Sequence, residues 1–219
     1  MEPTRENWRA ADAYLSETLV GHDSALEAAL AAQQDAGMPA IEVAPVSGKL
    51  LNLLVRMSGA RRVLEIGTLG GYSTIWMARG VGEGGRVVTV EAEAANAAVA
   101  RESIDAAGVG ERVDIRIGRA ADVLPTLVGE FDLVFIDADK ESNTIYLDWA
   151  AKLGHSGTVV VLDNIGRDGE IANADSTDSM VVGTQQALRM LGEDPRFDAT
   201  ALQTVGLKGW DGVAVALVV

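Results

Sequence analysis

Acidic and amide side chains follow three short apolar runs of the sequence, at the point where each run stops. Glu91 follows RVVTV, Asp137 follows FDLVFI, and Asp163 and Asn164 follow GTVVVL. Runs of this length that are rich in Val and Ile fit strands buried on both faces of a parallel sheet, and ligands bind at the carboxyl ends of such strands. The pattern predicts one crevice that holds a cofactor anchor and a metal site.

A glycine-rich turn, spaced G-x-x-G-G, follows the strand VLEI and precedes a helix. Glycines at a helix N-terminus let the backbone approach a ligand closely, but the spacing differs from the G-x-G-x-x-G typical of dinucleotide binding. Glu65, late in that strand, would repel a pyrophosphate and attract a cationic ligand. Glu91 ends the next strand, where a carboxylate can accept both hydroxyls of a ribose. The two acids favour S-adenosylmethionine, which is positively charged and has no phosphate.

Asp137, Asp163 and Asn164 offer three oxygen ligands to a metal ion. The chain contains no cysteine, so a metal must be held by oxygen or by its two histidines. Hard oxygen ligands suit Mg²⁺, and Mn²⁺ or Ca²⁺ can substitute for it. Lys140, three residues after Asp137, is placed to take a proton from a hydroxyl bound at such a site.

Strands and helices alternate through most of the chain, which predicts an α/β fold: a Rossmann-like, doubly wound, mostly parallel sheet. The expected strands are 62–66, 86–90, 112–117, 131–136 and 157–162, followed by an antiparallel pair at 198–204 and 212–218. The expected helices are two within 8–34, one from an N-cap at Ser47 to about Met57, and 72–79, 94–107, 120–127, 143–152 and 179–191. A tight turn at 209–212 would precede the last strand.

We expect one domain over residues 1–219, with an N-terminal helical arm (1–57) and a Rossmann-like core (58–219). No apolar stretch is long enough to span a bilayer, and the polar N-terminus does not resemble a signal peptide, so we expect a cytoplasmic protein that does not bind membranes. The formal net charge of −14 opposes binding to nucleic acid, because that affinity depends on Lys and Arg meeting phosphate.

The motifs VLEIGTLGGYST, VVTVE, FIDADK and LDN, with KGWDG near the end of the chain, occur in an order that resembles the class I O-methyltransferases of the catechol and caffeoyl-CoA type. The resemblance implies S-adenosylmethionine as methyl donor. It implies that the methionine end is lined by Glu65, Gly67, Thr68 and Ser73, with the Val43 backbone nearby. It further implies that Glu91 binds the ribose, that Ala120 and Asp139 lie near the adenine, and that Asp137 also contacts the cofactor.

The same resemblance assigns the metal, the base and the acceptor. Asp137, Asp163 and Asn164 would hold a divalent metal that receives the adjacent oxygens of a catechol, and Lys140 would be the general base. A metal favours the phenolate form of a phenol, whose ordinary pKa lies near 10. The ammonium pKa of Lys140 would need lowering, which nearby cations bring about.

Further members of the acceptor site are less closely specified by the resemblance. Arg167, Asp168 and Trp210, like Lys140, are candidate contacts to a phenolic acceptor. Asp168 occupies a position where the caffeoyl-CoA branch carries Asn, and Asn143 stands where many members carry Tyr, so the acceptor shape is expected to differ. Family members are commonly homodimers, which we expect here too.

Two alternatives to a methyltransferase remain open at this stage. One is a non-catalytic S-adenosylmethionine-binding or scaffold protein of the same fold. The other is an NAD-dependent oxidoreductase, which Glu65 and the glycine spacing oppose.

Overall fold

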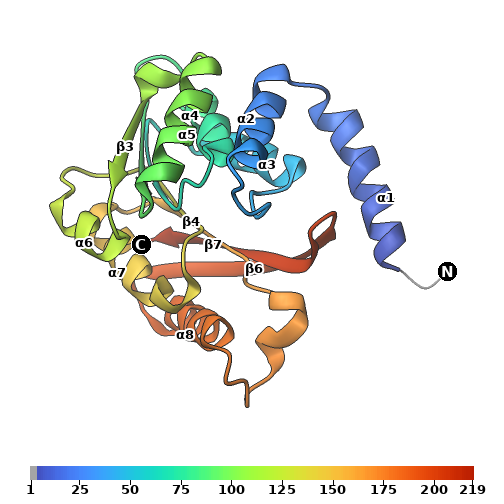
Figure 1. The fold of residues 1–219 in the computed structure, drawn as a ribbon. Coiled ribbons are helices and arrows are strands. Elements are labelled where there is room, and N and C mark those ends of the chain that lie inside the picture. The colour runs from blue at the N-terminus through green and yellow to red at the C-terminus, as the bar shows by residue number, and fades with distance from the viewer. Residues whose placement is uncertain (1–3) are drawn as a thin grey trace.

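Seven strands form one sheet in the computed structural model, which describes residues 4–219 (Figure 1). The strands are β1 (Arg62–Ile66), β2 (Arg86–Glu91), β3 (Val113–Ile117), β4 (Leu133–Ile136), β5 (Val159–Asp163), β6 (Phe197–Gly206) and β7 (Gly209–Val218). Their order is β3-β2-β1-β4-β5-β7-β6; the first five are parallel, and β7 is antiparallel to both of its neighbours. The predicted α/β fold class is confirmed.

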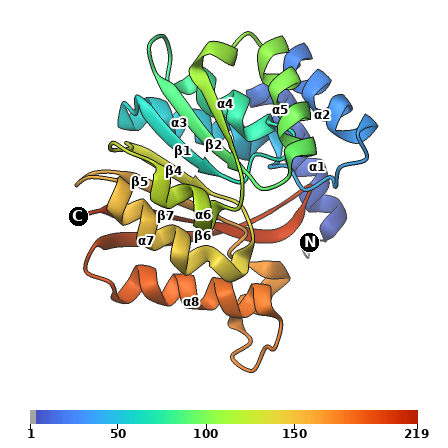
Figure 2. The ribbon, with the colours of Figure 1, turned by 60° about the vertical axis from the view of Figure 1, so that its left-hand side comes forward.

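Helices cover both faces of the sheet (Figure 2). They are α1 (Arg5–Leu15), α2 (Ser24–Asp35), α3 (Pro45–Ser58), α4 (Tyr72–Gly80), α5 (Ala94–Ala106), α6 (Ala120–Val123), α7 (Asn143–Leu153) and α8 (Ser179–Glu193). Shorter helical segments are η1 (Ser16–Val20), η2 (Gly110–Arg112), η3 (Leu124–Thr126), η4 (Lys140–Ser142) and η5 (Arg167–Ala172). No helix within residues 4–219 is both long and apolar enough to cross a membrane.

Each face of the sheet has its own apolar core. Ile75, Met77 and Val55 belong to the core under α2 to α5, whereas Leu64, Ile136 and Leu147 belong to the core under α6 to α8. All six side chains are fully buried. The continuous apolar runs of β1, β4 and β5 are explained by this arrangement, because both faces of these strands need apolar side chains.

The chain builds the sheet outward from its middle, from β1 through β2 to β3 on one side and from β4 to β5 on the other. The strand order therefore reverses between the neighbouring strands β1 and β4. Crevices open at the carboxyl ends of parallel strands where the order reverses in this way. The register pairs Ile66 with Ile136, so Gly67 and Asp137 leave the sheet at the same level. The sheet therefore places the glycine-rich turn beside the DADK segment.

Three local predictions were wrong. The third helix begins at Pro45, with Ala44 as its N-cap, and Ser47 lies inside it; proline suits the first turn because its fixed φ is helical and it has no N–H to leave unpaired. The residues expected to form a turn at 209–212 belong to β7, and the hairpin turns at Leu207 and Lys208. The α-helix expected over 120–127 ends at Val123 and continues as a tighter turn through Pro125.

Candidate functional site

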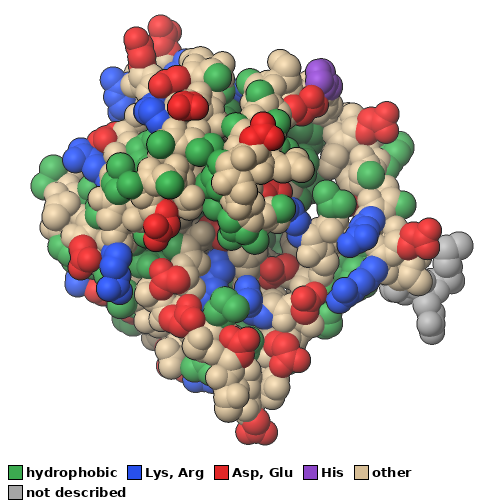
Figure 3. Space-filling view, viewed as in Figure 1, with side chains coloured by type: hydrophobic (Ala, Val, Ile, Leu, Met, Phe, Trp, Pro, Cys, Tyr) green, Lys and Arg blue, Asp and Glu red, His purple; other side chains and the backbone are tan. Residues whose placement is uncertain are grey.

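A cavity of about 730 Å³ opens at the carboxyl ends of β1, β2 and β4. Figure 3 shows this face of the molecule hollowed, with acidic and basic side chains around the opening. Most of the predicted site residues line the cavity: Val43, Gly67, Thr68, Ser73, Glu91, Ala120, Asp137, Asp139, Lys140, Asn164 and Arg167. A volume of this size suits one cofactor together with a small second molecule.

The turn between β1 and α4 depends on glycine at Gly67. Its φ is +102°, and a Cβ there would lie 2.4 Å from the carbonyl oxygen of Asp137. A larger residue would push the turn away from the DADK segment and would strain the backbone. Gly71, with φ +87°, then precedes the first residue of α4. The turn thus brings backbone to the cavity wall at a helix N-terminus, where it can meet a ligand closely.

Glu91 holds this turn in place. One of its carboxylate oxygens accepts the backbone N–H groups of Thr68 (3.2 Å) and Leu69 (2.8 Å), and the other accepts the N–H of Glu93 (3.0 Å). Only 7% of Glu91 is exposed, and it lines the cavity. The side-chain amide of Asn96 also donates to that second oxygen, at 3.4 Å, which fills the fourth of about four acceptor positions of a carboxylate. A diol would therefore bind Glu91 by taking the place of this long contact.

Glu65 does not lie where the resemblance implied. Its side chain is fully buried beneath the cavity and is absent from the lining. Its carboxylate accepts hydroxyls from Ser73 (2.5 Å), Thr89 (2.7 Å) and Thr74. Burial raises the pKa of Glu65 to about 7, against the lowering effect of these hydroxyls. The geometry supports Glu65 as a support for Ser73, which lines the cavity, and does not support a direct ligand contact.

Asp139 remains an acceptor at the cavity edge, where the resemblance implied adenine. Tyr146 on α7 donates its hydroxyl to Asp139 at 2.5 Å. Burial alone would raise the pKa of Asp139, but hydrogen bonds from Ser142 and Tyr146 outweigh it, so the pKa lies below its usual value. The carboxylate is therefore ionised near neutral pH and can accept a hydrogen bond from a ligand amino group.

The predicted metal ligands come together at the ends of β4 and β5. Asp137 lines the cavity beside Asn164, while Asp163 lies just behind and accepts the N–H of Asn164 at 2.8 Å. Burial, and then the neighbouring Asp137 charge, raise the pKa of Asp163. Within residues 4–219, no three His, Cys, Asp or Glu side chains form a metal-binding group. The candidate set is two carboxylates and one amide.

Lys140 is buried at the same place. It is only 6% exposed, and its ammonium group donates to Asp137 at 2.9 Å. Helix α8 holds this segment from the other side: a Cβ on Gly183 would lie 2.4 Å from the carbonyl oxygen of Lys140. The sheet, the helix and the ion pair thus fix the amine within reach of the candidate metal ligands.

Asp211 is a site residue that the sequence reasoning missed. One of its oxygens accepts the side-chain amide of Asn164 (3.1 Å), and the other accepts the backbone N–H groups of Gly166 (2.8 Å), Arg167 (3.3 Å) and Gly212 (2.9 Å). An ionised carboxylate only accepts hydrogen bonds, so the Asn164 side chain turns its NH₂ toward Asp211 and keeps its oxygen free. Its signal in the sequence is the KGWDG motif, where the resemblance points to Trp210 and not to Asp211.

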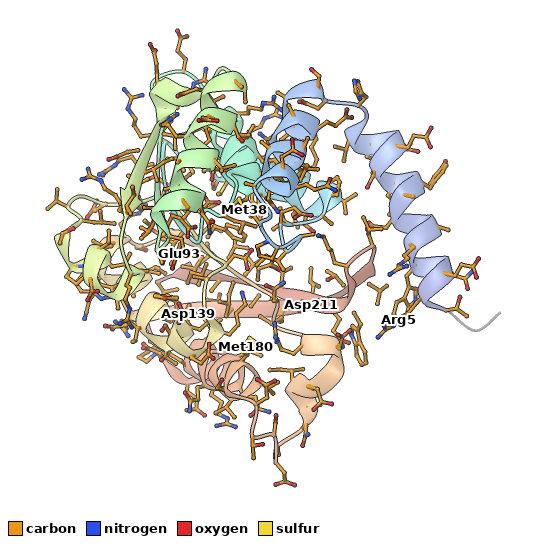
Figure 4. The ribbon with its side chains drawn as sticks, in the orientation of Figure 1. Arg5, Met38, Glu93, Asp139, Met180 and Asp211 are labelled. Carbon is orange, nitrogen blue, oxygen red and sulfur yellow. The ribbon has the colours of Figure 1, made fainter. Side chains whose placement is uncertain are left out.

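A second, smaller cavity of about 180 Å³ adjoins the first. Arg167 lines both cavities, whereas Asp168 and Trp210 line only the smaller one. Figure 4 shows Asp139, Met180 and Asp211 around the central opening, each from a different element. Three of the four predicted acceptor contacts, Arg167, Asp168 and Trp210, therefore line the smaller cavity, whereas Lys140 lines the larger one with Asn164.

Comparison with known proteins identifies the family. Residues 17–217 match the model of the O-methyltransferase family. The chain belongs to this family. The matched residues cover nearly the whole sequence and include every residue of the site described above.

Individual relatives agree with this assignment. The chain is 56% identical over 208 residues to a catechol O-methyltransferase of Mycobacterium tuberculosis, covering 94% of each chain. The structure of an O-methyltransferase from Bacillus cereus in complex with SAH is 47% identical, with a TM-score of 0.97 over 99% of this chain and 100% of that one. The O-methyltransferase TomG from Streptomyces achromogenes, solved with SAM, is 43% identical, with a TM-score of 0.95 over 99% of each chain.

The family membership confirms the resemblance and the expected enzyme class, an S-adenosylmethionine-dependent O-methyltransferase. It decides against the two alternatives, a non-catalytic scaffold and an NAD-dependent oxidoreductase. The individual site residues stay predictions, with the correction at Glu65.

Proposed function

We propose that this O-methyltransferase moves the methyl group of S-adenosylmethionine to a hydroxyl of a small aromatic acceptor with two adjacent hydroxyls, in a reaction that needs Mg²⁺. The observation that carries the proposal is the continuous cavity between Glu91 and the cluster of Asp137, Asn164 and Lys140. At one end of the cavity, beside the glycine turn, the Glu91 carboxylate can accept hydrogen bonds from the two hydroxyls of a ribose. At the other end lie oxygen ligands for a metal ion and the amine of Lys140. A catechol O-methyltransferase from M. tuberculosis, 56% identical, supports the choice of acceptor.

The cofactor would lie along the wall formed by the ends of β1 and β2. Glu91 would accept the ribose hydroxyls, and Asp139, with Ala120 nearby, would meet the adenine. Gly67, Thr68 and Ser73, with the Val43 backbone, would surround the methionine end. Glu65 would act indirectly, because its carboxylate accepts the Ser73 hydroxyl and so orients the Ser73 side chain.

The residues at the ends of β4 and β5 fit a divalent metal ion. Burial, and then the neighbouring Asp137 charge, raise the pKa of Asp163, and Asn164 turns its NH₂ toward Asp211 and its oxygen away from it. A hard cation bound by two carboxylates and an amide would stabilise both charges, and Mn²⁺ or Ca²⁺ could replace Mg²⁺. When bound, the cation favours the ionised form of a phenol, which makes it a better nucleophile at neutral pH.

Lys140 would take the proton of the attacking hydroxyl at its Nζ atom, for which it must first be neutral. The acceptor oxygen then attacks the methyl carbon, the new C–O bond forms as the C–S bond breaks, and the products are a methyl aryl ether and S-adenosylhomocysteine. The protein's part is to align oxygen, carbon and sulfur and to exclude water, since the charges of phenolate and sulfonium cancel during transfer. The position of the Lys140 amine, 2.9 Å from the candidate metal ligand Asp137, supports this role.

The acceptor would extend from Asn164 toward the smaller cavity. Arg167, Asp168 and Trp210 line that cavity and would contact the part of the acceptor that lies away from the diol. Trp210 is 40% exposed, which leaves its ring open to an aromatic partner.

A pair of variants tests the separation of the two ends. Glu91→Ala should weaken S-adenosylmethionine binding by about 10- to 100-fold, because a charged acceptor of hydroxyls is lost. Asp163→Ala should abolish metal-dependent turnover while S-adenosylmethionine binding stays within about tenfold. Calorimetry for the cofactor and rate measurements across a Mg²⁺ titration check both. Equal loss of cofactor affinity in the two variants would contradict the assignment.

We also propose that the enzyme forms a homodimer and binds neither nucleic acid nor membranes. Large apolar side chains are exposed on α3 and on the hairpin: Met57 (77%), Leu202 (62%) and Val205 (52%). A second copy would cover such side chains in a symmetric interface. Light scattering of the purified protein measures the mass that distinguishes a dimer from a monomer.

A further inference from the structure

Arg167 carries a charge without a partner at the junction of the two cavities. Its Nε atom is buried without a hydrogen-bond acceptor, and one Nη atom contacts only the sulfur of Met180, at 3.5 Å. Among residues 4–219, no carboxylate oxygen lies within 4.0 Å of the guanidinium nitrogens. A half-buried guanidinium offers five N–H donors, and nearly all of them are unused here.

The other ionic groups around the smaller cavity already have partners. Four carboxylates and one amine share that wall with Arg167. Two of these groups form ion pairs: Asp168 with Arg5 at 3.8 Å, and Lys208 with Glu42 at 2.6 Å. The other three accept hydrogen bonds: Glu170 from the Asn173 amide at 3.1 Å, Asp178 from the Met180 N–H at the start of α8 at 2.8 Å, and Asp211 from the Asn164 amide at 3.1 Å. Each of these groups therefore already has a polar contact within the protein. The charge of Arg167 is available to a ligand.

The backbone at Arg167 is fixed in an unusual conformation. Its φ is +51°, in the left-handed region that non-glycine residues seldom adopt. Asp211 holds it there by accepting its N–H, as it also does for Gly166. Asp211 thus orients the Asn164 side chain and also fixes the backbone from which the Arg167 side chain extends. An acceptor held at Asn164 would have this guanidinium beside it.

We propose that Arg167 binds an anionic group of the acceptor, so that the preferred acceptor is a dihydroxy aromatic compound bearing a carboxylate. This inference rests on the proposed function. A guanidinium fork matches a carboxylate through two parallel hydrogen bonds, and the pair would satisfy donors that are otherwise costly to leave unpaired. The four surrounding carboxylates would repel a doubly charged phosphate more strongly than a singly charged carboxylate.

Three acceptors of nearly equal size test the proposal: protocatechuate, the corresponding neutral benzyl alcohol and the corresponding cationic benzylamine. The wild-type enzyme should show kcat/KM for the acid at least about tenfold above that for the alcohol, and higher still relative to the amine. In Arg167→Gln, kcat/KM for the acid should fall by about 10- to 100-fold, mainly through KM, because charge-assisted hydrogen bonds are lost. The value for the alcohol should stay within about threefold.

Two further variants and one binding measurement separate this role from a general effect. Arg167→Lys, which keeps the charge without the fork, should retain the preference for the acid in reduced form. Arg189→Gln removes one exposed charge from the outer part of α8 and should leave the preference unchanged. S-adenosylmethionine affinity, measured by calorimetry, should be the same in Arg167→Gln as in the wild type, and a thermal melt verifies folding.

Each contrary result has its own meaning. Equal losses for acid and alcohol in Arg167→Gln, or a wild-type enzyme without preference for the acid, would overturn this inference while the proposed function stands. A loss confined to S-adenosylmethionine affinity would overturn it too, since Arg167 would then bind the cofactor's carboxylate. No turnover of any of the three compounds by the wild type would overturn the proposed function, and this inference with it.

Discussion

Two buried glutamates lie near the carboxyl ends of neighbouring strands, Glu65 on β1 and Glu91 on β2. Glu91 faces the cavity and accepts backbone N–H groups from the glycine turn. Glu65 faces inward, is fully buried, and accepts three hydroxyls. Both side chains lie on the same face of the sheet, because Glu65 pairs in register with Thr89, two residues before Glu91. They differ in depth: Glu91 ends its strand at the cavity, whereas Glu65 lies one residue before the end of β1 and is covered by Ser73 and Thr74 of α4. The sequence alone places both acids near the ligand, but it does not tell which of them α4 covers.

Glu65→Gln should reduce the pH dependence of stability. The pKa of Glu65 rises from its ordinary value of 4.5 to about 7 because of burial. Its contribution to stability is therefore fully present below pH 4.5, and it is lost as the pH rises through about 7, where the buried carboxyl must ionise. The difference in Tm between about pH 5 and about pH 8 should be smaller in the variant, which cannot ionise. An unchanged difference would show that Glu65 titrates normally.

Asp211→Asn tests the orientation of Asn164. The new NH₂ group would lie against that of Asn164, or would make Asn164 turn its oxygen away from the metal. Metal affinity should then fall by about 10- to 100-fold, as for other residues that orient a metal ligand. Binding of Mn²⁺, followed by electron paramagnetic resonance, measures this directly, and S-adenosylmethionine affinity should change little. Asp198→Asn on the exposed part of β6 is the matched control; equal affinities in the two variants would contradict the role.

The candidate metal ligands and the candidate base can be predicted from the sequence because each of them follows a strand. Asp137, Asn164 and Lys140 stand where parallel strands end, so topology alone brings them to one edge. Asp211 could not be found in this way, because it belongs to the antiparallel β7 and reaches Asn164 across 47 positions of sequence. Arg167 appeared only as a possible acceptor contact. Its lack of a partner depends on which neighbouring carboxylates are engaged, and spacing does not reveal that.

At the scale of elements, the sequence correctly predicts the regular alternation of strands and helices, but it does not predict where some of the helices and turns begin and end. The strands and helices from β1 to β5 follow the predicted order, because their apolar runs are set by burial on two faces. Two wrong predictions concern Ser47 and the turn at 209–212, where polar or glycine-rich residues suit more than one local structure. The third is the α-helix expected over 120–127, within which Pro125 falls. Packing decided the first two cases: the antiparallel pairing of β6 with β7 extends to Gly206 and Gly209.

The contact of α8 with η4 gives a prediction about an element. A Cβ on Gly183 would meet backbone atoms of Lys140 and Glu141, at 2.4 and 2.8 Å, which cannot rotate aside. Gly183→Ala should therefore move α8 away from Lys140, with about 1–3 kcal/mol lost from the free energy of unfolding and a marked fall in kcat. Gly192→Ala is the control in the same helix, because no atom lies within 4 Å of its Cβ. Denaturant unfolding and rate assays compare the two, and similar behaviour would contradict the packing argument.

At the scale of the whole molecule, the cavity is enclosed by parts that are distant in sequence. The sheet supplies the ends of β1, β2 and β4, and the segment before α3 closes one side through Val43 and Glu42. Glu42 pairs with Lys208 on the hairpin, so the N-terminal region is tied across the opening to the last strands. The division into an arm (1–57) and a core (58–219) stays a prediction, and the arm contributes directly to the site.

The most direct test of the account is a methyl-transfer assay with S-adenosylmethionine and catechol, run with Mg²⁺, with EDTA, and with Mg²⁺ restored after EDTA. We predict turnover that disappears with EDTA and returns with Mg²⁺. In Lys140→Ala the rate should fall by about 100- to 10,000-fold, the usual contribution of a general base. Turnover that persists in EDTA, or that survives the loss of Lys140, would contradict the proposed metal site and base.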